Sequence, residues 1–188
     1  MRQRDQFTRT ARLGLLLGWL WAGAAAAGPA PGWFADHLAE LTADGGVWIA
    51  DNAAYRSEQE KAEAYGLQWR YGVGKRSAVG RLYAIIGGQD TGTIWEFRMY
   101  WHPGQDQALL LQFGAGGAVL NGPLTIEEDG SDRLQQTFYR PDGSQVEIGH
   151  LTRHPAPGVH EGGSYDIDAE GNWQARRSYT WHRQPAAG

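Results

Sequence analysis

The densest group of residues able to do chemistry lies in residues 95–102, which read Trp-Glu-Phe-Arg-Met-Tyr-Trp-His. Hydrophobic and ionisable side chains alternate along this segment, a pattern typical of a β-strand with one apolar and one polar face. In one interpretation the apolar set lies in a core, and the charged set pairs with Arg70 and Arg81 on the surface. In the other, the segment borders a wide β-barrel whose interior holds a ligand.

The second interpretation names a specific set of ligand-binding residues. Pockets for small molecules combine mostly apolar walls with a few polar anchors. An arginine inside such a pocket favours a carboxylate-bearing ligand, because the guanidinium group binds a carboxylate through two parallel hydrogen bonds. The predicted walls are Trp69, Tyr71, Trp95 and Trp101, and the predicted anchors are Arg81, Arg98, His102 and Gln112.

The same segment also supports two other hypotheses. An isomerase or hydrolase could use His102 with Glu96 or Tyr100 as acid and base, provided that these side chains converge in a concave site. A barrel packed solid with side chains would instead suit a structural or interaction module. Fold alone does not choose among the three, because barrels of this type have many functions.

Other residue patterns resemble metal sites, but a simpler interpretation is available for each. His150 and His154 are four residues apart, with His160 and Glu161 close behind, yet that spacing suits a zinc site only on a helix, and Pro155 opposes one. Residues 166–171 place oxygen ligands and a glycine as a calcium loop does. Arg177 occupies the position of the final acidic ligand, so a hairpin turn is predicted and no metal site.

Catalytic and cofactor motifs are otherwise scarce. Asp90-Thr91-Gly92 matches the catalytic tripeptide of aspartic proteases, but a single copy would need a partner and a turn is the simpler interpretation. The sequence contains no nucleophile elbow, phosphate-binding loop or dinucleotide fingerprint. We therefore expect no cofactor.

The elements that must position these residues are predominantly strands. Alternating segments separated by Gly-, Pro-, Asn- and Asp-rich turns predict ten strands and no long helix, which favours antiparallel hairpins over a parallel α/β fold. They centre near Val47, Leu67, Leu82, Phe97, Leu111, Thr125, Phe138, Ile148, Tyr165 and Tyr179. Residues 33–43 have helical spacing and predict a short helix, and residues 154–163 form the most loop-like stretch.

The predicted fold class is all-β, an antiparallel up-and-down β-barrel of about 8–10 strands with a short N-terminal helix. Closure into a barrel removes the two exposed edges that a sheet of this kind would otherwise have. A β-sandwich is the alternative. The distinction bears on function, because a barrel of about eight strands has room for one small ligand, whereas a sandwich fills its interior with side chains.

The first residues predict export. Four arginines in residues 1–12 precede an apolar run that ends in Ala24-Ala25-Ala26-Ala27, the organisation of a signal peptide cut after residue 27. The apolar run is shorter than a bilayer requires, so no stable membrane anchor is expected after cleavage. Residues 28–188 then form a single domain in the periplasm or outside the cell.

Composition narrows the function classes further. The leader holds four arginines and one aspartate, so the remainder carries 13 basic and 20 acidic residues, a balance that argues against nucleic-acid binding. The sequence contains no cysteine, so the core must stabilise the domain without disulfides. Nine tryptophans and eight tyrosines suit broad strands and ring-lined cavities.

A family resemblance supports the same fold. Gly46-Val47-Trp48, after the short helix and at the start of the first strand, is similar to the Gly-x-Trp signature of lipocalins. Lipocalins pack a late basic residue over that tryptophan, and Arg176, Arg177 and Arg183 are all candidates. The chain thus resembles the lipocalin-like, or calycin, domains of exported bacterial proteins, although it lacks their usual cysteines and Thr-Asp-Tyr loop. The resemblance implies a cup for a small hydrophobic or amphipathic molecule.

Overall fold

The computed structural model describes residues 29–186, so the leader predicted at residues 1–27 lies outside the described residues. One α-helix precedes ten strands, and three short 3-10 helices lie between elements: α1 Gly32–Thr42, η1 Ala43–Gly45, β1 Val47–Asp51, η2 Ala53–Tyr55, β2 Ala64–Tyr71, η3 Val73–Lys75, β3 Ser77–Ile86, β4 Gln89–His102, β5 Gln107–Gly114, β6 Val119–Ile126, β7 Asp132–Tyr139, β8 Gln145–Ala156, β9 Val159–Ile167 and β10 Trp173–Arg183. Within residues 29–186, no helix is long and apolar enough to cross a membrane.

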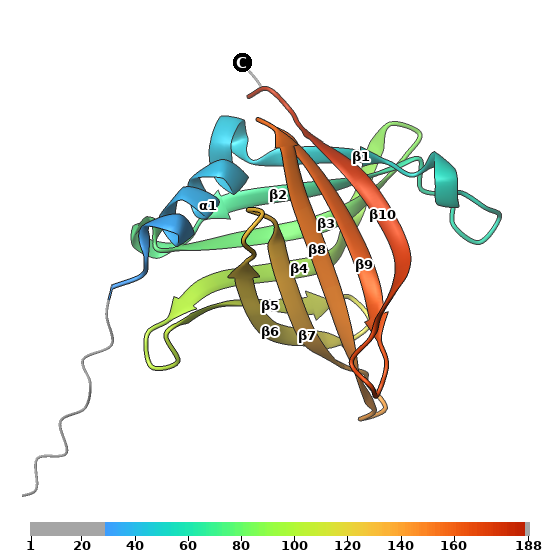
Figure 1. Cartoon of the computed structure of the whole chain (residues 1–188). Coiled ribbons are helices and arrows are strands. Elements are labelled where there is room, and N and C mark those ends of the chain that lie inside the picture. Colours follow the sequence, from blue (N-terminus) through green and yellow to red (C-terminus); the bar gives the residue numbers. More distant parts are fainter. Residues whose placement is uncertain (1–28, 187–188) are drawn as a thin grey trace, which may run out of the picture.

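The ten strands form a closed antiparallel barrel in which each strand pairs with its neighbours in sequence and β1 pairs with β10 (Figure 1). The up-and-down barrel predicted from the alternation and turn pattern is therefore confirmed, and the sandwich alternative is wrong. Each of the ten predicted strand centres lies in the corresponding strand. Strict alternation works here because successive side chains of a strand point to opposite faces of the barrel wall.

One stretch departs from the prediction. Residues 154–163, expected to be a loop, belong mostly to β8 and β9, which pair until Ala156 meets Val159 across a tight turn at Pro157 and Gly158. Pro and Gly are strong turn signals, but they also occur at strand ends and bulges, and the β8–β9 ladder has such an irregularity between Arg153 and Ala156. The prolines thus mark the hairpin rather than a long loop.

Closure of the barrel depends on a short seam between β1 and β10. Only three residue pairs join these strands, from Trp48 opposite Arg183 to Ala50 opposite Trp181. Beyond Ala50 the seam is continued by side chains of the segment between β1 and β2. Tyr55 in that segment accepts a hydrogen bond at its hydroxyl from the backbone N–H of Ser178 at 2.8 Å. Ser178, which lies outside the three pairs with β1, is therefore bonded to the segment between β1 and β2 on this side of β10.

Helix α1 covers one end of the barrel, which we call the helix end (Figure 1). Its buried residues Phe34, Leu38 and Leu41 recur at helical spacing and join the core cluster. The indole nitrogen of the fully buried Trp48 donates a hydrogen bond to the carbonyl of Leu41 at 3.0 Å, so it satisfies one of the carbonyls left free at the end of α1. Arg183 lies over the Trp48 ring at 5.4 Å. Trp48 thus joins the helix, β1 and β10.

The barrel wall is interrupted at Gly122 and Pro123 in β6. The β6–β7 ladder lacks the two pairs that these residues would form, and proline has no N–H to donate. The side chain of Gln136, fully buried, fills the position and donates to the carbonyl of Leu110 at 2.8 Å. A Cβ on Gly122 would overlap the carbonyl oxygen of Gln135, so only glycine fits here.

Replacing Gly122 should test this close approach. We expect Gly122→Ala to lower the free energy of unfolding by about 3 kcal/mol, because the added methyl group forces β6 and β7 apart. Urea unfolding monitored by tryptophan fluorescence measures the change. Gly116→Ala is the matched control, since a Cβ there meets nothing within 4 Å, and it should change stability by no more than about 0.5 kcal/mol. Equal effects of the two substitutions would contradict the interpretation.

Candidate functional site

The inner faces of the strands enclose a cavity of about 530 Å³ inside the barrel. Helix α1 contributes His37 and Leu41 to its wall at the helix end, and Arg176 lies in its wall at the opposite end. Most of the lining side chains are apolar: Leu41, Trp48, Leu67, Trp69, Leu82, Ile94, Trp95, Phe97, Met99, Leu110, Leu120, Leu124, Leu134, Ile148 and Trp181. The interior is therefore partly hollow, with the composition of a small-molecule site.

Three of the predicted ligand-binding residues line this cavity: Trp69, Trp95 and Gln112. The ring of Trp69 stacks on Phe97 with centroids 5.2 Å apart and lies against Gly80, where a Cβ would collide with the indole. The rings of Trp95 and Phe138 pack edge to face with their centroids 6.3 Å apart. Ring contacts between β2 and β4, and between β4 and β7, thus hold both indoles in the wall, so that a ligand would meet a preformed aromatic surface.

Gln112 is the polar member of this group, and a hydrogen bond to the buried Gln136 fixes its side chain. Its amide nitrogen donates to the side-chain oxygen of Gln136 at 2.5 Å. Gln136 in turn donates to the carbonyl of Leu110, which orients both amides. The remaining oxygen of Gln112 is left to accept a hydrogen bond in the cavity wall.

Two further predicted wall residues lie inside the protein but not around the cavity. Trp101 packs under α1, with ring centroids 6.0 Å from Trp33 and 5.9 Å from Phe34. Tyr71 packs against the core cluster near the end of β2, and the Lys75 amine lies 5.5 Å from its ring. Both aromatic rings serve the packing at the helix end, because α1 covers that end of the barrel.

Three predicted polar anchors lie outside the barrel, which corrects the expectation that they face a ligand. Arg81 bonds to Asp90 at 2.7 Å and to Gln68 at 3.0 Å, and all three are on the outer face. Arg98 is exposed, and His102 accepts a hydrogen bond at Nδ1 from the backbone of Gln105 at 3.1 Å. The reason is alternation. Because Trp95, Phe97, Met99 and Trp101 face inward, their neighbours in β4 must face outward.

The same alternation determines where the acid and base residues of the enzyme hypothesis lie. Glu96, Tyr100 and His102 all lie on the outer face of β4, and the rings of Tyr100 and His102 are 6.4 Å apart. None of the three lines the cavity. The concave site that this acid and base would need is therefore not formed by these residues.

Two arginines that the sequence analysis did not assign to the site do reach the cavity wall, because β10 contains a β-bulge. The register with β9 shifts between Ala175 and Arg177, and the extra residue lets both Arg176 and Arg177 border the interior. Arg176 is more than half exposed and has one ion pair, to Asp166 at 3.4 Å. A bulge cannot be located from alternation alone, so sequence reasoning could not choose between these arginines.

Arg177, in contrast, is fully engaged in the polar network beside the seam. Its guanidinium group binds both oxygens of Glu60 at 2.7 Å, and these hydrogen bonds lower the pKa of Glu60 to about 2. Tyr65 donates to the same carboxylate at 2.8 Å, and its burial together with this bond raises the pKa of Tyr65 to about 12. Asn52, fully buried, links Glu60 to Tyr179. Arg177 is therefore held by protein groups, whereas Arg176 is the more available cation.

His150 and His160 are the two histidines of the cavity wall whose buried Nε2 atoms lack a hydrogen-bond partner, and His150 lies away from the helix end. Its Nε2 atom makes no hydrogen bond, and burial, helped by the nearby charge of Arg176, lowers the pKa of His150 to about 4. The imidazole is therefore neutral at pH 7. Sequence reasoning considered His150 only as a metal ligand, although its alternation with Ile148 and Thr152 already indicated a shared face.

The sequence motifs that resembled metal or catalytic sites have structural explanations. Asp168 accepts hydrogen bonds from the backbones of Glu170 and Asn172, which makes residues 168–172 the hairpin turn predicted in place of a calcium loop. Asp90 lies in β4 rather than in the turn expected for it. Among residues 29–186, no group of three or more His, Cys, Asp or Glu side chains is arranged to hold a metal ion.

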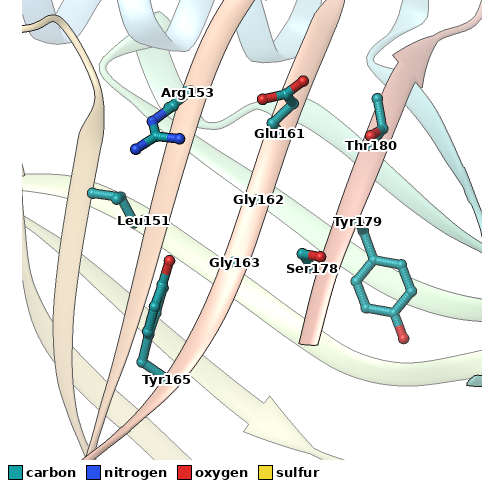
Figure 2. A pocket seen from close by; sticks show the side chains of 9 residues that line it. All are labelled: Leu151, Arg153, Glu161, Gly162, Gly163, Tyr165, Ser178, Tyr179 and Thr180. Atoms are coloured by element: carbon teal, nitrogen blue, oxygen red, sulfur yellow. The ribbon is translucent and has the colours of Figure 1, made fainter. Parts of the chain in front are cut away.

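A second, smaller hollow of about 230 Å³ lies on the outer wall over β8, β9 and β10 (Figure 2). Its floor is the backbone of Gly162 and Gly163, where β9 has no side chains. Leu151 and Arg153 of β8 border one side, and Ser178 and Thr180 of β10 border the other (Figure 2). This hollow is less than half the volume of the interior cavity, and Leu151 is its one aliphatic lining residue, so the interior cavity is the stronger candidate site.

The state of His150 should be visible in the pH dependence of stability. Because folding depresses its pKa from 6.5 to about 4, the folded state loses up to about 3 kcal/mol as the pH falls through this window. We expect His150→Leu to abolish that part of the acid destabilisation, measured as urea midpoints at pH 7 and pH 4. The exposed His182→Gln is the control. Identical losses in the wild type and His150→Leu would contradict the assignment.

Comparisons with known proteins do not assign the chain to a family. A search of protein-family models finds none that matches the chain. A search of curated proteins also finds no match. The fold and the cavity therefore stand on the structure itself.

Proposed function

We propose that the protein is a lipocalin-like binding protein, exported from the cell, that holds a small hydrophobic or amphipathic molecule inside its barrel. The observation that carries this proposal is the cavity of about 530 Å³, walled mainly by apolar and aromatic side chains. Burial of apolar ligand surface against such walls supplies about 25 cal/mol per Å² of driving force before the costs of association.

The few polar groups in the wall suggest how the ligand is oriented. Gln112 offers an amide oxygen, and Arg176 offers a cation at the end opposite α1. An amphipathic molecule would place its apolar body among the indoles and its polar or anionic head near Arg176, where water can still reach the charge. Trp48 with Arg183 over its ring supports the lipocalin-like part of the proposal.

Binding can be tested with the domain spanning residues 28–188. We expect a hydrophobic fluorophore such as 8-anilinonaphthalene-1-sulfonate, and fatty acids competing with it, to bind saturably and to change tryptophan emission, because Trp69 and Trp95 line the cavity. Leu82→Trp should weaken binding at least about tenfold by filling the space, a loss of about 1.4 kcal/mol.

Two controls make this experiment decisive. Arg98→Gln changes an exposed outer residue and should leave binding unchanged. Circular dichroism and urea midpoints must show that Leu82→Trp is folded. Fluorophore binding that is equal in the wild type and in folded Leu82→Trp would place the ligand outside the barrel, and no saturable binding by any probe would reject the function.

Export is a separate part of the proposal, supported by the basic and apolar segments of residues 1–27. Expression of the whole chain in a Gram-negative host should deliver the protein to the periplasm with a mass that corresponds to a cut near Ala27. Replacing Leu15, Leu16 and Leu17 by Gln should keep the chain uncleaved in the cytoplasm, because the apolar run would be broken. Cytoplasmic, full-length wild-type protein would contradict export.

A further inference from the structure

Titratable side chains from several elements meet where α1 joins the barrel. We call them the helix-end cluster: His37 and Glu40 of α1, Asp44 of η1, Asp132 of β7, His154 of β8, His160 of β9 and Arg183 of β10. Among residues 29–186, the ion pairs between α1 and the strands all lie in this cluster. The cluster is therefore the main electrostatic contact between the helix and the strands.

Asp132 is the centre of one half of the cluster. Its Oδ2 atom lies 3.0 Å from Nε2 of His154 and 3.7 Å from Nδ1 of His37. The hydrogen bond to Asp132 raises the pKa of His154, whereas burial lowers the pKa of His37. At neutral pH, a carboxylate of the barrel thus faces a neutral imidazole from the helix.

Glu40 is the centre of the other half. Its carboxylate forms an ion pair with the guanidinium group of Arg183 at 3.1 Å and accepts a hydrogen bond from the backbone N–H of Gly158 at 3.4 Å. Nε2 of His160 lies 3.7 Å from it, too far for a hydrogen bond. Arg183 also contacts Asp44 at 3.2 Å. These contacts tie α1 to β9 and β10.

His160 is buried and poorly placed to accept a charge. Its ring stacks on Trp48 with centroids 4.0 Å apart, and it meets the edge of His154 at 4.5 Å. Burial, and secondarily the charge of His154, lower the pKa of His160 to about 4. His160 is therefore neutral as long as the helix is in place.

The cluster also borders the cavity. His37, Asp132 and His160 line its wall at the helix end, beside Leu41 and Trp48. A displacement of α1 would remove Leu41 and His37 from that wall. Access to the interior at this end is consequently coupled to the contacts of the cluster.

We propose that the helix-end cluster is an acid-operated latch, which holds α1 over the cavity at neutral pH and lets it lift at acid pH. Acid adds positive charge to His37 and His160 beside His154 and Arg183, where burial leaves that charge poorly solvated. Release of cargo through the lifted end would rest on the proposed function, but movement of the helix does not.

The sign and size of the effect follow from linkage. The folded pKa of His160 is depressed, so the closed arrangement keeps its full stability above pH 6.5 and loses it as the pH falls toward 4. If the imidazole recovers its ordinary pKa of 6.5 when α1 lifts, His160 alone raises the open-to-closed ratio about 30-fold between pH 7.5 and pH 5. His37 adds to this in the same direction.

Hydrogen exchange of the ligand-free domain tests the latch directly. After correction for the intrinsic pH dependence of exchange, we expect residues 32–42 to lose protection by at least about tenfold between pH 7.5 and pH 5. Strands β4 and β5 exchange by global unfolding, which protonation of His150 also favours, so they should stay more protected than α1 at both pH values although their protection falls as well.

Variants separate the latch from general acid sensitivity. His160→Phe keeps an aromatic ring on Trp48 but cannot titrate, so it should suppress most of the change in α1. His182→Gln, at an exposed position of β10, should behave as the wild type. Equal protection of α1 and the strands at pH 5, or an unchanged response in folded His160→Phe, would overturn the proposal.

Ligand release is measured in a second arm. If 8-anilinonaphthalene-1-sulfonate binds at pH 7.5, its dissociation rate should rise toward pH 5 in the wild type and less in His160→Phe. If no probe binds but α1 still loses protection, the function proposal fails and the latch stands. If the probe binds and α1 keeps its protection at pH 5, the latch fails and the function stands.

Discussion

Closure of the barrel across three residue pairs is the constraint on which the rest of the structure depends. A ten-stranded antiparallel sheet has two edges, and here they meet only from Trp48–Arg183 to Ala50–Trp181. So short a seam requires support on both sides. Trp48 supplies it at the helix end, where its ring contacts His160 and Arg183 and its indole nitrogen binds α1. The network of Asn52, Glu60 and Arg177 supplies it beyond Ala50.

The hollow interior is a consequence of that closure and of how the indole rings are packed. Here Trp69 stacks on Phe97 and lies over Gly80, so the large ring is held flat against the wall and does not fill the centre. Gly80 therefore helps to keep the cavity open, because its missing side chain leaves room for the Trp69 ring against the wall.

The polar groups in the wall fall into two sets, those that stabilise the barrel and one that has no partner. Arg177 and Glu60 neutralise each other and serve closure, and Gln136 repairs the wall at Pro123. His150, with no partner for Nε2, contributes nothing to stability that an apolar residue could not. A buried polar group left unpaired calls for an explanation, and this residue lies in the wall of the candidate site.

The sequence by itself determined the class of fold and the ten strands, because these depend on local alternation and turn chemistry. It left open which face of β4 lines the interior. It also placed Trp69, Trp95 and Gln112 in the group that lines the cavity. Only the tertiary structure decided that Trp101 packs under α1, that Arg81, Arg98 and His102 face outward, and that a bulge brings Arg176 to the wall. The meeting of His37 and Asp132 with the His154–His160 pair was equally invisible, since α1 and β7 are separate in the chain from the β8–β9 hairpin that carries both of these histidines. The physical reason is that a side chain's direction along a strand is a local property, whereas what it meets there depends on register, bulges and barrel closure, which are set by contacts between distant segments.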